Sequence, residues 1–211
     1  MSCCLLIFEK IEMLRLNPEK GRPYINLHYY LPLAASILDL YIKGNLSFEK
    51  KKVQIRNPDY DDPLLKEPIE LISQGVKIHP IWRALVLLRA SSGVFIDGEV
   101  YKKYIKLGIL RDGSAKRPKL YFNQEDFQKK IIDEIKNTTL GVEKPDIENY
   151  FVLKALKMGH ILDKYFTKPE IKVIKAHLKK KPSEIGIDPI MADLINRLVK
   201  EVRRKSGIHH S

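Results

Sequence analysis

The sequence predicts a mainly α-helical single domain with a central buried helical bundle, surrounding amphipathic helices and two short β-hairpins. Two observations lead to this class: several long segments carry apolar residues at helical spacing, and two short pairs of segments alternate around turns. The chain has 211 residues, of which 44% are apolar, and this is enough for one substantial core. We expect one domain over residues 1–211, with its core at about 5–205 and a tail at 206–211.

The first third of the chain is expected to hold one short element and one buried helix. Residues 5–16 suit either a helix or a strand, and Pro and Gly residues at 17–21 predict a turn after it. In residues 24–43 the apolar positions cover more than one helical face, which is typical of a buried helix. Gly44 follows as a glycine stop.

A hairpin and a capped helix come next. Residues 46–48 and 53–55 alternate on either side of a lysine-rich tip, which is the pattern of a two-stranded hairpin. Asp62 is then expected as an N-cap, followed by a proline at the first helical position. Pro68 is expected to shorten or bend this helix.

The rest of the chain predicts a second hairpin between helices. Separate helices are expected at 81–90 and 100–107, the latter stopped by Gly108, with a link at His79-Pro80 before the first. Residues 110–122 form the second hairpin candidate. The remaining helices are expected at 126–139, 146–165, 168–180 and 189–204.

The charge balance favours an anionic partner. The 38 Lys and Arg residues exceed the 26 Asp and Glu residues and give a net charge of +12. Residues 151–211 hold 14 Lys and Arg residues against 6 Asp and Glu residues, and the densest group is Lys179, Lys180 and Lys181. Such a surplus suits phospholipid head groups, nucleic acid or an acidic protein. The alternative is a set of solvated helix faces, and both interpretations stay open.

Several classes of protein are not indicated. No apolar run approaches the ~18 residues of a membrane-spanning helix, and the only cysteines, Cys3 and Cys4, are adjacent and cannot staple distant segments. The histidines lack metal-ligand spacing, and there is no glycine-rich phosphate loop and no nucleophile elbow. We therefore expect a cytoplasmic protein that is not an enzyme and has no metal or cofactor.

Four segments, in the same order, resemble the Golgi phosphoprotein 3 family. Leu-Asp-Leu-Tyr-Ile-Lys-Gly-Asn-Leu at 38–46 is similar to the end of the family's buried helix, and Asp-Asp-Pro-Leu-Leu-Lys-Glu at 61–67 is similar to the segment that follows its first hairpin. Residues 106–110 match the segment before its second hairpin, and 130–166 follow the order of its two late helices. The resemblance covers most of residues 5–200.

This resemblance implies a non-enzymatic adaptor that binds phosphoinositide-bearing membrane and recruits membrane-protein cargo. The family's phosphate pocket falls, by ungapped placement, on Tyr24, Leu33, Val94 and Asp97. Tyr24 can replace the family's aromatic residue, whereas the other three positions replace arginines. Losing three arginines removes the charge-assisted bonds that select phosphate, so specificity for phosphatidylinositol 4-phosphate is not carried over.

The second hairpin is the other candidate membrane contact. The resemblance implies that its basic residues meet acidic lipid while its apolar residues enter the interface. The alternative is a small strand pair packed on its own domain. The candidate residues are Arg111, Lys116, Arg117, Lys119, Leu120, Tyr121 and Phe122.

Two functions from different classes follow. The first is a peripheral membrane adaptor that docks a basic face on an anionic phospholipid surface, with a phosphatidylinositol phosphate as one such lipid. The second is nucleic-acid binding, because the helix within 101–110 followed by a basic hairpin is similar to a recognition helix with a wing.

Overall fold

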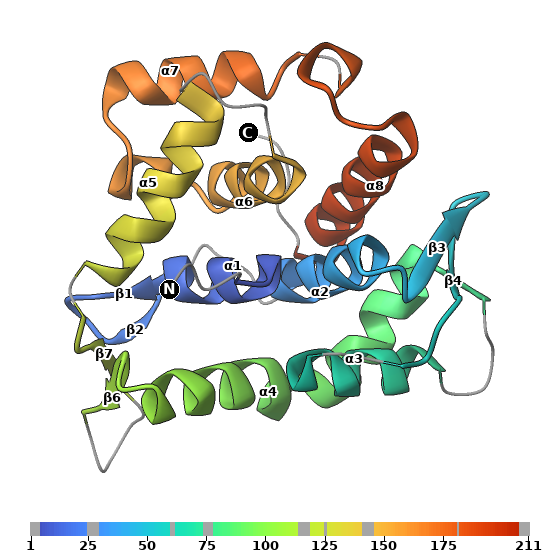
Figure 1. Cartoon of the computed structure of the whole chain (residues 1–211), viewed down its shortest axis with the longest axis horizontal. Coiled ribbons are helices and arrows are strands. Elements are labelled where there is room, and N and C mark those ends of the chain that lie inside the picture. Colours follow the sequence, from blue (N-terminus) through green and yellow to red (C-terminus); the bar gives the residue numbers. More distant parts are fainter. Residues whose placement is uncertain are drawn as a thin grey trace. The chain divides into compact units, whose positions relative to one another are not determined.

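The computed structural model describes residues 5–24, 30–59, 62–73, 78–113, 119–124, 126–140, 146–180 and 182–206. At positions 78, 82, 89–97, 182, 183, 205 and 206 only the backbone is described. Figure 1 traces the chain from the N-terminus in blue to the C-terminus in red. The chain divides into two compact units. Unit 1 comprises Met1–Glu9, Tyr29–Val100 and Ile190–Ser211, and unit 2 comprises Lys10–His28 and Tyr101–Pro189.

Unit 1 is built from helices and one small sheet. Helices α1 (Ile7–Arg15) and α4 (Ile81–Lys106) each contribute residues to both units. The other elements of unit 1 are α2 (Tyr30–Ile42), β3 (Leu46–Glu49), β4 (Lys52–Ile55), α3 (Pro63–Ser73), β5 (Ile78–Pro80) and α8 (Pro189–Ser206).

Helix α2 is the buried helix that the sequence predicts. Its residues from Tyr30 to Leu40 are all buried. The two polar members have local partners: the Ser36 hydroxyl donates to the carbonyl oxygen of Leu33 at 2.9 Å, and the Asp39 carboxylate accepts from the backbone N–H groups that open α1. Those bonds, from Ile7 and Phe8, measure 2.9 and 3.1 Å. Asp39 therefore satisfies donors that a helix start leaves without helical partners.

The first hairpin is confirmed, and a third strand joins it. Strands β3 and β4 pair antiparallel, with Phe48 opposite Val53. The expected link at His79-Pro80 is wrong, because these residues form β5 and pair with β4. The imidazole Nε2 of buried His79 lies 2.9 Å from the carbonyl oxygen of Ile72, and this bond ties β5 to α3.

The N-cap of α3 is confirmed. The Asp62 carboxylate accepts a hydrogen bond from the backbone N–H of Leu64 at 2.9 Å, which is the usual N-cap bond. Pro68 lies buried inside the helix, which continues to Ser73.

Unit 2 contains two hairpins and a group of helices. Helix α5 packs against α6 and α7, all drawn in yellow to orange in Figure 1. The elements are β1 (Leu16–Asn17), β2 (Arg22–Pro23), β6 (Leu110–Asp112), β7 (Leu120–Phe122), α5 (Phe127–Leu140), α6 (Ile147–Met158), η1 (Leu162–Lys164), α7 (Lys168–His177) and η2 (Pro182–Ile185).

Two helix predictions need correction. The helices expected at 81–90 and 100–107 are one continuous helix, α4, which ends before Gly108 as predicted. The helix expected at 146–165 ends at Met158. It ends there because His160 adopts a left-handed backbone with φ of 53°, which no right-handed helix accommodates.

The fold class is confirmed as mainly helical, with short antiparallel strand pairs; helices hold 65% of the chain. That the two units form one domain stays a prediction. Among the helices in the described part of the chain, none combines the length and the apolar character needed to cross a bilayer.

Candidate functional site

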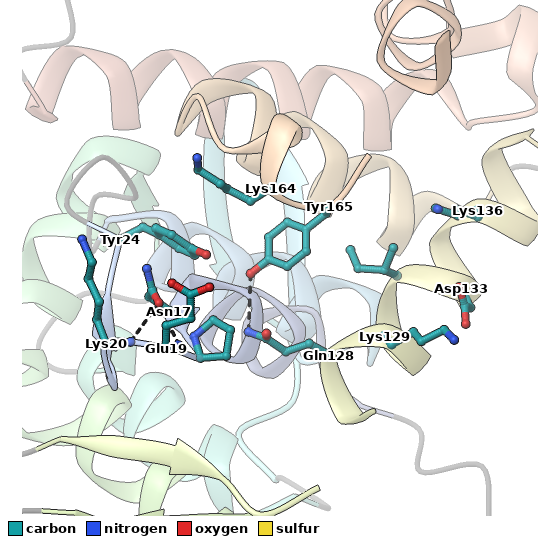
Figure 2. Close-up of a pocket in the computed structure, with 12 residues that line it drawn as sticks. Asn17, Glu19, Lys20, Tyr24, Gln128, Lys129, Asp133, Lys136, Lys164 and Tyr165 are labelled. Carbon is teal, nitrogen blue, oxygen red and sulfur yellow. Dashed lines mark hydrogen bonds between the residues drawn. The ribbon is translucent and has the colours of Figure 1, made fainter. Parts of the chain in front are cut away.

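A cleft of about 760 Å³ lies within unit 2 and includes Tyr24. We call it the Tyr24 cleft; it is bordered by the β1–β2 turn, α5 and η1 (Figure 2). Its lining residues are Asn17, Pro18, Glu19, Lys20, Tyr24, Gln128, Lys129, Ile132, Asp133, Lys136, Lys164 and Tyr165. Three chain segments distant in sequence therefore build one site.

The β1–β2 turn fixes one side of the cleft. The Asn17 side-chain oxygen accepts from the backbone N–H groups of Glu19 and Lys20 at 2.9 and 3.0 Å, which is an Asx turn. Gly21 follows with φ of +61°, a conformation that glycine adopts without a steric penalty. The Tyr24 N–H then donates to the carbonyl oxygen of Arg15 at 2.8 Å. These bonds hold Lys20 and Tyr24 in place.

Buried hydrogen bonds fix the other two sides. The Gln128 amide donates to the carbonyl oxygens of Met13 and Leu16 at 2.7 and 2.8 Å. The Tyr165 hydroxyl donates to the carbonyl oxygen of Leu14, and the Gln128 amide also lies 3.4 Å from that hydroxyl, as Figure 2 shows. These bonds attach α5 and the end of η1 to the last turn of α1.

The two tyrosines keep their protons. Burial raises the pKa of Tyr24 above its usual value. Burial also raises the pKa of Tyr165, and the neighbouring Tyr24 phenol adds to this effect. Both hydroxyls are therefore neutral at physiological pH, and a hydrogen bond between them places the Tyr24 phenol beside Tyr165 in the lining of the cleft.

The cleft carries more cations than anions. Lys20, Lys129 and Lys164 are exposed, and Lys164 has only a 3.4 Å ion pair with Asp163. Within the part of the chain that the structure describes, neither Lys20 nor Lys129 has a carboxylate partner. The fourth lysine, Lys136, is paired with Glu170 at 2.9 Å. Two carboxylates, on Glu19 and Asp133, complete the charged lining.

Among the other three positions predicted for the phosphate pocket, only Leu33 has a described side chain. Leu33 has only 1% of its surface exposed and belongs to the core of α2. The side chains of Val94 and Asp97 lie outside the description. Of the two pocket positions whose side chains the structure describes, Tyr24 lines the cleft and Leu33 does not.

The second hairpin supports the β1–β2 turn. The Tyr121 ring leaves no space beside two glycines: a Cβ on Gly21 would lie 3.0 Å from the ring, and one on Gly113 would lie 2.4 Å from it. The Leu120 N–H donates to the carbonyl oxygen of Gly21 at 2.9 Å. The guanidinium carbon of exposed Arg111 lies 5.4 Å from the centroid of the Tyr121 ring.

The remaining hairpin residues also pack within unit 2. Phe122 stacks on Phe127 with ring centroids 6.3 Å apart. Lys119 and Leu120 are half-buried, whereas Lys116 and Arg117 lie outside the described residues. The packing favours the alternative of a strand pair packed on its own unit over a hairpin that presents its apolar side chains to a membrane.

The lysines after α7 lie on the surface. Lys179 and Lys180 are exposed, and their backbone N–H groups donate to the carbonyl oxygens of Ala176 and His177. Lys181 lies outside the described residues. Neither Lys179 nor Lys180 lines the Tyr24 cleft.

Sequence analysis missed most of the cleft. It named Tyr24 but not Lys20, Lys129, Lys164 or Gln128, because no local pattern shows that separate segments will meet. The one available signal was the turn at 17–21. No group of three His, Cys, Asp or Glu residues that could hold a metal ion occurs among the residues described.

No protein-family model matches the chain, and no curated protein matches it either. The resemblance to the Golgi phosphoprotein 3 family therefore stays a prediction.

Proposed function

We propose that this protein is a non-enzymatic peripheral membrane-binding adaptor that docks on anionic lipid at the cytoplasmic face of a membrane. The observation that carries the proposal is the Tyr24 cleft, in which a protonated phenol and the exposed lysines Lys20, Lys129 and Lys164 surround one space. The recruitment of membrane-protein cargo rests on the family resemblance alone.

The chemistry of the cleft suits a lipid phosphate. A phosphate oxygen accepts hydrogen bonds from ammonium groups, and such charge-assisted bonds are roughly twice as strong as neutral ones. Each basic residue near an anionic surface contributes ~1 kcal/mol. Lysine acts as a point charge without the planar fork of arginine. We therefore propose recognition of anionic head groups in general, with no selectivity for phosphatidylinositol 4-phosphate.

The hairpin has a supporting role in this proposal. Its Tyr121 ring and Leu120 N–H hold the turn that carries Lys20, while exposed Arg111 adds one cation to the same unit. The apolar residues of β7 pack within the unit, so membrane attachment would depend mainly on charge.

Liposome flotation tests the proposal. The protein is expected to float with vesicles of phosphatidylcholine mixed with phosphatidylserine or phosphatidylinositol 4-phosphate, and to stay behind with phosphatidylcholine alone. Binding should weaken as salt rises, because exposed charges are screened. Equal flotation with neutral and anionic vesicles would contradict the proposal.

Nucleic-acid binding is the second candidate, and one observation favours it. The C-terminal part of α4 exposes Lys102 and Lys106 and is followed by the β6–β7 hairpin, which exposes Arg111. This order matches a helix followed by a wing. A gel-shift assay with duplex DNA at low salt tests it: phosphate contacts predict binding that weakens steeply as salt rises, and no shift at low salt would exclude it.

A further inference from the structure

A second hollow in unit 2 lies where the end of α6, η1 and α7 meet. It has a volume of about 300 Å³, and we call it the His160 hollow. Its lining residues are Lys157, His160, Leu162, Asp163, Ile171 and Lys175. None of these lines the Tyr24 cleft, so the hollow is a separate feature of the molecule.

The lining combines basic groups with an apolar floor. Leu162 is buried and Ile171 half-buried, while His160 and Lys175 are exposed. Asp163 is the single carboxylate of the lining, and its oxygen already lies 3.4 Å from the Lys164 ammonium. The hollow therefore offers the exposed His160 imidazole and the exposed Lys175 ammonium to a ligand, against one carboxylate that is already paired.

The backbone of His160 is an unusual choice for its position. It follows the last turn of α6, where a left-handed residue is usually glycine, yet its φ is 53° while the preceding Gly159 has φ of −77°. A left-handed backbone costs a non-glycine residue roughly 1–2 kcal/mol. The Ile161 N–H donates to the carbonyl oxygen of Leu156 at 3.1 Å and the His160 N–H donates to that of Lys157 at 3.2 Å, so a Schellman motif supports this backbone. The motif explains the conformation but not the histidine, whose side chain is exposed at a position that glycine usually fills.

Lys175 belongs to a row of lysines along α7. Lys168, Lys172 and Lys175 are all exposed, and their spacing of four and three residues places them on one side of the helix. The start of α7 is fixed by a capping box, in which the Glu170 carboxylate accepts from the Thr167 N–H at 2.7 Å. Lys175 thus lies on a capped helix and lines the same hollow as His160.

We propose that the His160 hollow is a second anion site, which binds a phosphate monoester with His160 and Lys175 donating to its oxygens. Phosphate fits better than a single carboxylate, because its greater charge and its three free oxygens match several donors on different elements. The site goes beyond the membrane attachment proposed for the Tyr24 cleft and does not depend on it.

The substitution His160→Gly separates a binding role from a structural one. Titration with inorganic phosphate, followed by NMR shifts of the histidine ring and of the α7 amides, should show binding by the wild type. H160G should bind about tenfold more weakly, as expected for one lost bond to a charged group. Its denaturation midpoint should stay equal or rise, because glycine relieves the left-handed backbone. Unchanged affinity, or a lower midpoint, would overturn the proposal.

Two matched variants control the test. Lys51→Gly relieves another left-handed residue, with φ of 68° at the tip of the β3–β4 hairpin in unit 1, and should leave phosphate affinity unchanged. Lys175→Gln should weaken binding, while Lys172→Gln, on the same helix but outside the hollow, should change it less than about twofold. Equal losses for K175Q and K172Q would contradict a defined site.

Binding to vesicles shows whether the phosphate ligand is a lipid head group or a soluble phosphate monoester. If the ligand is a lipid head group, H160G should lower binding to vesicles that contain phosphatidic acid more than binding to vesicles with the same charge from phosphatidylserine. If the ligand is a free phosphate monoester, H160G should weaken binding of soluble phosphate alone. Either result supports the site, and no effect of H160G on soluble or vesicle phosphate refutes it.

Discussion

The buried helix of unit 1 and the end of α1 in unit 2 are both inaccessible to solvent, but they are stabilised differently. Helix α2 buries an almost entirely apolar surface, with Ser36 and Asp39 as its polar exceptions. In unit 2, the part of α1 from Lys10 to Arg15 buries three charged residues: Lys10, Glu12 and Arg15. The Arg15 guanidinium donates to Glu12 at 2.8 Å, and the Lys10 ammonium donates to Glu134 at 2.7 Å.

This difference assigns the two units different tasks. Buried apolar side chains fill space without direction, whereas buried polar groups need specific partners. In unit 2, Lys10 finds its partners on α5 and α6, and α5 also borders the Tyr24 cleft. Burial alone would lower the pKa of Lys10, yet hydrogen bonding and the charges of Glu134 and Glu148 raise it. Unit 1 is therefore interpreted as scaffold, and unit 2 as the part that binds.

The largest effect is expected at Leu33, where the family that the sequence resembles has an arginine. Leu33→Arg places a charge in the core of α2 and should destabilise the protein by about 3–5 kcal/mol, without restoring phosphate binding. Chemical denaturation measures this. Leu33→Met is the control and should cost less than about 1.5 kcal/mol. A stable L33R protein that gains affinity for phosphoinositides would contradict the interpretation of unit 1 as scaffold.

The next comparison removes one buried polar side chain from each unit. Asp39→Ala deprives two backbone N–H groups of α1 of their acceptor, and Gln128→Ala removes the donor to two carbonyl oxygens. Each should cost about 1–3 kcal/mol in unfolding free energy. Only Gln128→Ala should also weaken flotation with anionic vesicles, measured where both variants are folded. Equal loss of flotation in both would show that the cleft does not set affinity.

The same contrast explains what the sequence could predict. The apolar pattern of 30–42 and the Asp62 cap are local signals, and both are confirmed. The pairing of β5 with β4 was missed, because His79-Pro80 gives no strand signal and the contact is tertiary. The continuity of α4 was missed because glycine and serine residues at 91–98 weaken the helix prediction, which tertiary structure overrides. The lysines of the cleft come together only through the polar network of unit 2.

Replacing one glycine by alanine in each unit should have smaller effects on stability, and the two effects can be compared directly. Gly44→Ala in unit 1 meets nothing within 4 Å of the new Cβ, although φ is +78°. It should cost about 1 kcal/mol from backbone strain alone. Gly21→Ala adds contacts of 3.0 Å to the Tyr121 ring and 3.1 Å to the oxygen of Leu120. It should cost more than Gly44→Ala and weaken anion binding by moving Lys20. Equal costs in thermal unfolding would contradict the supporting role of the hairpin.

The smallest effect is expected from His177 of unit 2, which packs edge-on against the Tyr150 ring at 6.0 Å. Burial, and then the charge of Lys180, lower the pKa of His177 below 6.5 in the folded state. Below that pH the unfolded chain binds more protons than the folded one, so stability is lost as the pH falls. The stability difference between wild type and His177→Gln should therefore change as the pH is lowered from about 7.5 to about 5. A difference that is independent of pH would contradict this assignment.

The most direct test of the central claim compares two variants with the same loss of charge. One carries Lys20→Gln, Lys129→Gln and Lys164→Gln in the Tyr24 cleft; the other carries Lys43→Gln, Lys52→Gln and Lys66→Gln at exposed positions of unit 1. At ~1 kcal/mol for each lysine, the cleft variant should bind anionic vesicles about a hundredfold more weakly, while the unit 1 variant keeps most of the wild-type affinity. Equal losses in the two variants would contradict a defined lipid-binding cleft in unit 2.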